Sequence, residues 1–103
     1  MPRPELLNDS DITYNLEKLP NWQLVDSTVP PRKIECEVAL PNFAAAIGAI
    51  NAIAVLAEAA DHHPDILLYA WNHLRITLST HDRGGLTELD FTLAAKIDEL
   101  GLF

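Results

Sequence analysis

The sequence is poor in cysteine, in glycine and in positive charge. Its lone cysteine, Cys36, excludes a disulfide within the 103-residue chain. Its four glycines form neither a phosphate-binding loop nor a G-x-S-x-G turn, so we discount acyl transfer by such a turn. Seven basic residues stand against 15 acidic ones, and the net charge of −8 weighs against direct binding of nucleic acid or of an anionic membrane surface.

The remaining composition is that of an ordinary folded protein. Hydrophobic residues make up 49% of the chain and charged residues 21%. Folding a chain of this length buries about 65% of its surface, which is enough for one modest core. We therefore expect a single domain over residues 1–103, with 1–7 as a loose N-terminal lead-in. The N-terminus lacks the apolar core of a signal peptide, so a cytoplasmic protein is expected.

The most apolar stretch, residues 43–60, is predicted to be a buried helix and not a membrane span. Alanine dominates it, Asn51 and Glu58 interrupt it, and Pro41 suits its first turn. Its apolar and small residues form two adjacent rows, which cover more of the helix than one thin sheet can bury. We therefore expect a homo-oligomer, either a homodimer or a homotetramer.

Periodicity predicts six further elements. Ile12, Leu16 and Leu19 recur at helical spacing before Pro20, and Thr87 to Asp90 matches a capping box. The expected segments are a first helix ending before Pro20, strands at 22–25, 33–40, 66–71 and 74–80, a break at 27–31, a two-residue turn at Asn72-His73, a loop at Gly84-Gly85 and a last helix before Gly101. This order, α-β-β-α-β-β-α, predicts an α+β two-layer sandwich with a four-stranded antiparallel sheet covered on one face by helices.

Histidines and carboxylates gather where these elements end. His62 and His63 follow the long helix, and His81 ends a strand that the hairpin can return toward that helix terminus. Glu58 and Asp61 precede the pair, and Asp82 follows His81. Imidazoles titrate near neutral pH, and an adjacent carboxylate can fix their tautomer, so the group suits proton transfer.

Plainer interpretations stand beside this one. The His-His-Pro run also fits a polar helix cap followed by a breaker, and Thr77, Ser79 and Thr80 fit simple strand formers. We expect His73 to be a solvated turn residue and Cys36 to be a small core residue. Three histidines and a carboxylate could hold zinc, but no HxH, HExxH or CxxC spacing occurs, so we expect no metal and no cofactor.

The combined pattern resembles the signature of the pterin-4a-carbinolamine dehydratase family over roughly residues 8–103. The pattern consists of Glu58-Ala-Ala-Asp-His62-His63-Pro64, Trp71, His81 and Asp90, with the strand Ile76-Thr77-Leu78-Ser79-Thr80-His81. Between Pro64 and Trp71 the chain is one residue longer than animal members, which could alter a pocket rim or an oligomer contact.

The resemblance implies dehydration of 4a-hydroxytetrahydropterin to quinonoid dihydropterin, which recycles the cofactor of aromatic amino-acid hydroxylases. It implies that the catalytic residues are His62, His63 and His81, and that the pterin-binding residues are Glu58, Asp61, Ser79, Thr80 and Asp82. We assign the two proton transfers to His62 and His81, and binding and orientation mainly to His63.

The same family implies a second hypothesis, in which the protein binds other proteins without catalysis. Animal members serve as dimerisation cofactors of a homeodomain transcription factor, and a degenerate bacterial branch resembles Rubisco assembly factors. Members that have lost the enzymatic role need not keep the histidines. This chain keeps all three, which favours the enzyme.

Overall fold

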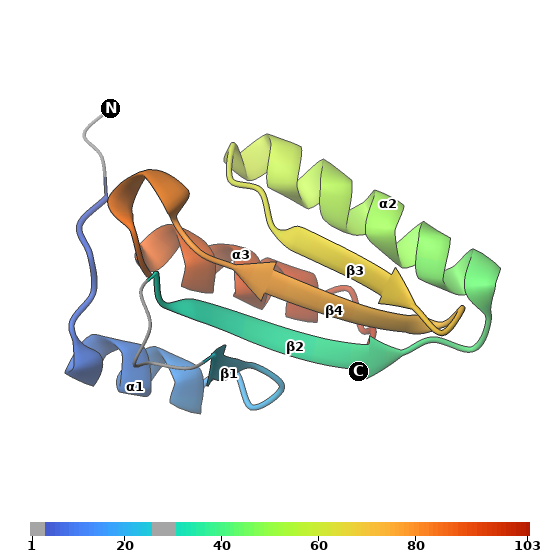
Figure 1. The fold of residues 1–103 in the computed structure, drawn as a ribbon, viewed down its shortest axis with the longest axis horizontal. Coiled ribbons are helices and arrows are strands. Elements are labelled where there is room, and N and C mark those ends of the chain that lie inside the picture. Colours follow the sequence, from blue (N-terminus) through green and yellow to red (C-terminus); the bar gives the residue numbers. More distant parts are fainter. Residues whose placement is uncertain (1–3, 26–30) are drawn as a thin grey trace.

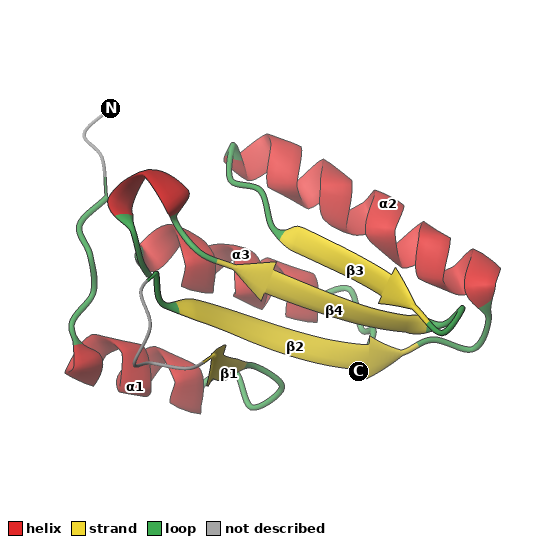
Figure 2. Cartoon of the chain, viewed as in Figure 1, coloured by secondary structure: helices red, strands yellow, loops and turns green. Residues whose placement is uncertain are grey.

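The chain folds into three helices and a four-stranded antiparallel sheet (Figure 1). The computed structural model describes residues 4–25 and 31–103. In chain order the elements are α1 (Asp9–Glu17), β1 (Gln23–Val25), β2 (Lys33–Ala39), α2 (Phe43–Ala60), β3 (Asp65–Tyr69), β4 (His73–Leu78), the 3-10 turn η1 (His81–Arg83) and α3 (Glu88–Asp98). The strand order is β1-β2-β4-β3, and every neighbouring pair is antiparallel (Figure 2). The predicted α+β sandwich is confirmed.

Buried and more exposed side chains alternate along the central strands, so one face of the sheet is covered and the other is not. Ile34 and Cys36 of β2 are buried, and the register places them opposite Leu78 and Ile76 of β4. The intervening residues of β2, such as Glu37, lie on the other face and are not buried. A period of two is what one covered face requires, since successive side chains of a strand point to opposite sides.

All three helices pack on that one apolar face. Ile12 of α1, Ile53 of α2 and Leu93 of α3 join Ile34 and Ile76 in one cluster of buried side chains. Burying a side chain of this size contributes roughly 1.5–3 kcal/mol. A second cluster, made of Leu40, Ala46, Ala49 and Leu74, fixes the first half of α2 against the sheet.

Helix α2 corrects two predictions. It begins after Asn42 and not at Pro41, because the Asn42 side chain accepts a hydrogen bond from the Ala45 N–H (2.8 Å) and so caps the helix. It is buried on one face only. Ala46 and Ile53 are inaccessible, whereas Val55 on the opposite side is 70% exposed. The expectation of a buried helix therefore holds for half of its circumference.

By length and composition alone, α2 is apolar enough to cross a membrane. Only 22% of its residues are buried within the chain. A helix that packs one face on a sheet passes the same test, so this property alone does not place α2 in a lipid bilayer.

The β3–β4 hairpin differs from its prediction. The turn is formed by residues 70–72, not by Asn72-His73, and the left-handed residues are Ala70 (φ 46°) and Trp71 (φ 59°). Asn72 is engaged elsewhere: its backbone and side chain both bond Leu40, which ties the turn to the end of β2. His73 is therefore the first residue of β4, where it is half-buried and stacks on Tyr69 at 5.2 Å. The prediction that His73 is a solvated turn residue is wrong.

Two predicted loop segments, the break at 27–31 and the lead-in at 1–7, are described only in part by the structure. The expected break at 27–31 lies mostly outside the described residues, as do the first three residues of the lead-in. Within the described part of that lead-in, the Leu7 N–H donates to the Leu86 carbonyl at 2.9 Å. The segment before α1 is therefore tied to the loop that precedes α3.

Cys36 is a core residue, as predicted. It is 1% exposed, and burial raises the pKa of its thiol to about 12, with smaller contributions from nearby carboxylates. We expect iodoacetamide to leave Cys36 unmodified in the folded protein at neutral pH and to alkylate it fully in denaturant, as read by mass spectrometry. Rapid alkylation of the folded protein would contradict this.

Candidate active site

The end of α2 turns the chain so that two consecutive histidines point in different directions. Asp61 caps the helix in the left-handed conformation (φ 49°), which an aspartate tolerates better than most residues. The next N–H, that of His62, bonds back to the Ala57 carbonyl at 3.1 Å. His62 is buried with 8% exposure, whereas His63 is exposed.

His62 is held by a buried carboxylate from a distant part of the chain. Its Nε2 lies 2.6 Å from Oδ1 of Asp90, which is fully buried in the first turn of α3. The other oxygen, Oδ2, accepts from the Thr80 hydroxyl (2.8 Å) and from the Thr87 N–H (2.9 Å). The two threonine hydroxyls lie 2.7 Å apart. We call these four residues, His62, Thr80, Thr87 and Asp90, the buried network.

No described residue occupies the second nitrogen of His62. Its Nδ1 makes no hydrogen bond within residues 4–25 and 31–103. The only buried side-chain nitrogen or oxygen without a partner among those residues is Arg83 Nε. The His62 side chain is 9% exposed, so Asp90 fixes the imidazole at Nε2 while Nδ1 keeps no partner from the described residues.

His63 has a different environment. Its Nε2 lies 2.5 Å from Oε2 of Glu58, five residues earlier on α2, and both side chains are largely exposed. An exposed pair of this kind adds little to stability. The hydrogen bond to Glu58 does hold the His63 ring close to the C-terminal end of α2, next to His62.

The end of β4 brings the third histidine to the same end of the molecule (Figure 1). Thr80 belongs to the buried network, and His81 follows it as the first residue of η1. Figure 1 shows η1 and the α2–β3 connection at the same end of the molecule. His81 and Asp82 are exposed, and the His81 imidazole makes no hydrogen bond to the described residues.

The predicted pterin-binding residues fall into two groups. Glu58, Asp61 and Asp82 are exposed near the histidines. The hydroxyls of Ser79 and Thr80 point inward instead: Ser79 Oγ donates to the Arg32 carbonyl at 3.0 Å, and Thr80 Oγ1 to Asp90. Both residues are buried, so their visible role is to shape the end of β4.

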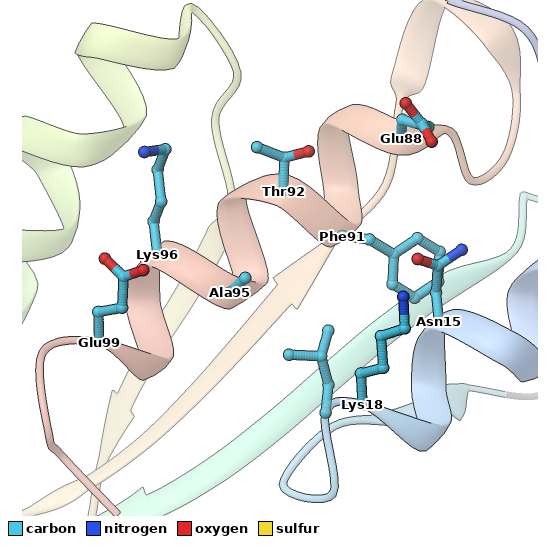
Figure 3. Close-up of a pocket in the computed structure, with 9 residues that line it drawn as sticks. Asn15, Lys18, Glu88, Phe91, Thr92, Ala95, Lys96 and Glu99 are labelled. Atoms are coloured by element: carbon cyan, nitrogen blue, oxygen red, sulfur yellow. The ribbon is translucent and has the colours of Figure 1, made fainter.

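A hollow of about 370 Å³ lies elsewhere, between α1 and α3. Figure 3 shows Asn15 of α1 and Lys18, which follows α1, beside Phe91 of α3, with Glu88 farther along α3. It contains none of the residues predicted to act on a substrate. The candidate site is therefore the open end of the sheet, beside the histidines, and not this hollow.

Two members of the buried network are missing from the predicted site residues, namely Asp90 and Thr87. The sequence carried a signal for both: they form the capping box of α3, and Asp90 ends the family signature. A capping box explains the two residues by local structure alone. It does not indicate that the same carboxylate also binds a histidine 28 residues earlier.

Comparison with known proteins shows which family the chain belongs to. The family model described as pterin 4 alpha carbinolamine dehydratase matches residues 5–100. A relative from Chloroflexus aggregans is 48% identical over 91% of this chain and 95% of its own length. One from Picosynechococcus is 43% identical over 91% of this chain and 96% of its own. Both are named pterin-4-alpha-carbinolamine dehydratases, with a qualifier that marks the assignment as provisional.

Two solved structures share the fold. A "transcriptional coactivator/pterin dehydratase" from Brucella melitensis is 33% identical, with a TM-score of 0.85 over 93% of this chain and 98% of that chain. A pterin dehydratase-like protein described as a RuBisCO assembly factor of the alpha-carboxysome is 25% identical, with a TM-score of 0.63 over 78% of this chain and 88% of that chain. Because the family model matches nearly the whole sequence and the fold is shared, the chain belongs to the pterin-4a-carbinolamine dehydratase family.

Proposed function

We propose that the protein dehydrates 4a-hydroxytetrahydropterin by histidine acid–base catalysis. The observation that carries the proposal is the His62–Asp90 pair, which leaves Nδ1 of a fixed imidazole open beside two exposed histidines. A histidine that only supports the fold does not need a ring nitrogen without a protein partner. General acid–base catalysis does need one, within reach of the proton that moves.

The reaction requires two proton transfers. The C4a–O bond breaks, and the departing hydroxyl takes a proton from an imidazolium to leave as water. The N5 proton goes to a neutral imidazole, and the N5–H electrons form the C4a=N5 double bond of quinonoid dihydropterin. We assign these transfers to His62 and His81, which approach from different segments, and the orientation of the pterin to His63.

The direct test is a dehydratase assay. A hydroxylase generates 4a-hydroxytetrahydropterin, and its decay is followed spectroscopically with and without the protein. We expect decay to accelerate in proportion to protein concentration. An unchanged decay rate, with well-folded protein at micromolar concentration, would contradict the proposed function.

Metal independence is a separate prediction. Within residues 4–25 and 31–103, no three His, Cys, Asp or Glu side chains are grouped so that they could hold a metal ion. Loss of hydroxide from a carbinolamine also needs no Lewis acid when an imidazolium supplies the proton. We expect dialysis against a strong chelator to leave the rate unchanged. A rate that is lost on chelation and restored by zinc would show that this prediction is wrong.

Self-association is a further prediction, carried by the outer face of α2. Its large exposed side chains are Phe43, Ile47 and Val55. The smaller exposed residues of the same helix include Ala44, Gly48, Ala54 and Ala59, and the exposed polar residues are Asn51 and Glu58. Large apolar side chains exposed together on one helix of a small protein are typical of an interface.

We expect light scattering at micromolar concentration to give at least about 23 kDa, twice the chain mass of 11.4 kDa. Val55→Glu should reduce that mass, because it places a charge in the centre of the exposed α2 face. Tyr14→Glu, a matched change at an exposed aromatic of α1, should not reduce it. A wild-type mass of one chain would contradict the prediction.

Protein binding without catalysis is the second candidate function. The exposed apolar face of α2 favours it, because the same surface could receive a different protein. Of the two solved relatives, one is described as a coactivator as well as a pterin dehydratase, and the other as an assembly factor. The dehydratase assay separates the candidates, since an assembly factor need not accelerate the decay of the pterin.

A further inference from the structure

We infer that Thr87 and Thr80 are positioning residues for His62: acting through Asp90, their hydroxyls hold the imidazole in the tautomer and orientation that leave Nδ1 open. The catalytic part of this inference rests on the proposed dehydratase function. The positional part concerns the folded protein alone and can be tested without any activity.

The direction of each hydrogen bond follows from the groups present. Asp90 Oδ2 accepts from the Thr80 hydroxyl, so the Thr80 hydrogen is used there. Of the two threonine hydroxyls, Thr87 must therefore donate and Thr80 accept. Thr87 Oγ1 in turn accepts from the Leu89 N–H at 3.2 Å. The hydrogen bonds therefore all donate in one direction: the Leu89 N–H to Thr87, the Thr87 hydroxyl to Thr80, and the Thr80 hydroxyl to the Asp90 carboxylate.

The donors around Asp90 determine which nitrogen of His62 carries the hydrogen. Asp90 Oδ2 already accepts two donors, and the carboxylate lies at the N-terminus of a helix, where backbone N–H groups favour a negative charge. An ionised Asp90 leaves Oδ1 as an acceptor, so His62 Nε2 must carry the hydrogen. Neutral His62 then has its lone pair on Nδ1, the nitrogen that no described residue binds.

Burial makes this arrangement hard to replace. Thr87 and Asp90 are 0% exposed and Thr80 is 2% exposed, so water cannot readily substitute for a missing hydroxyl. Without the Thr87 hydroxyl, Thr80 Oγ1 loses its donor and can rotate away from Asp90. A carboxylate with fewer fixed donors holds the His62 ring less firmly.

The competing explanation is that Thr87 only caps α3. Capping needs the Thr87 oxygen as an acceptor, whereas positioning also needs its hydrogen, donated to Thr80. Thr87→Val removes the hydroxyl at similar size, and Thr87→Ser keeps it. Asn42→Ala is the matched control, because it removes the cap of α2 at an exposed position outside the site. Loss of the cap destabilises either helix.

The test combines nitrogen NMR of the imidazoles with steady-state kinetics. Two-bond ¹H–¹⁵N spectra recorded over a pH series identify the tautomer of His62 in its neutral form. We expect the Nε2–H tautomer alone in wild type, Thr87→Ser and Asn42→Ala, and mixed tautomers in Thr87→Val. We expect kcat of Thr87→Val to fall about 10-fold with KM within about 2-fold, since a slightly misplaced catalytic group lowers the rate and not substrate affinity.

Each outcome decides the inference. If Thr87→Val loses stability as Asn42→Ala does but keeps the tautomer and kcat, Thr87 is a cap only and the inference is overturned. Should Thr87→Val fail to fold, the Nδ1–H tautomer in wild-type protein would overturn it alone. If wild type lacks dehydratase activity, the proposed function fails, while the NMR comparison still tests the positioning.

Discussion

Replacing His81 by alanine is expected to lower kcat about 10²–10³-fold, the range for loss of a general acid or base. His81 is exposed and its imidazole has no partner among the described residues, so the variant should fold normally. The same loss is expected for His62. There, His62→Gln is the better variant, because its amide can still donate toward Asp90, whereas alanine would leave the buried Oδ1 of Asp90 without a donor.

His73→Ala is the matched control for these variants. His73 lies at the opposite end of β4 from His81 and stacks on Tyr69 away from the site. Its replacement removes an imidazole without touching the buried network, so kcat should stay within about 2-fold of wild type. A well-folded protein lacking both His62 and His81 that keeps the wild-type rate would refute the assignment.

Asp90→Ala is expected to lower the free energy of unfolding by about 3–5 kcal/mol, as when one partner of a buried charged pair is removed. The change leaves three donors facing a cavity: His62 Nε2–H, the Thr80 hydroxyl and the Thr87 N–H. Asp90→Asn should also destabilise the protein, because its NH₂ group must face donors on one side or the other.

Urea unfolding followed by circular dichroism measures the effect. The matched control is Glu88→Ala, an exposed carboxylate in the same first turn of α3. It removes a favourable interaction with the helix dipole, which is worth at most about 1 kcal/mol at an exposed position. Equal urea midpoints for Asp90→Ala and Glu88→Ala would contradict the prediction. They would show that the buried hydrogen bonds of Asp90 add no stability beyond that of an exposed carboxylate in the first turn of α3.

The sequence by itself determined the elements that depend on local patterns. Alternation at 33–40 predicted which side chains of β2 meet the helices, because a strand with one covered face must alternate. The Thr87-x-x-Asp90 spacing predicted where α3 begins, since both members lie within one turn. The order of the elements then predicted the sandwich, and the spaced histidines predicted the family.

Only the tertiary structure decided what depends on contacts between distant segments. The hairpin turn moved to 70–72 because Asn72 bonds Leu40, more than 30 residues earlier. Ser79 and Thr80 turned inward because Arg32 and Asp90 offer acceptors there. Asp90 became a partner of His62 because α3 starts beside the end of β4. A spacing pattern reports which residues share a turn or a strand face; it carries no information on which acceptor a buried hydroxyl or imidazole meets across the core.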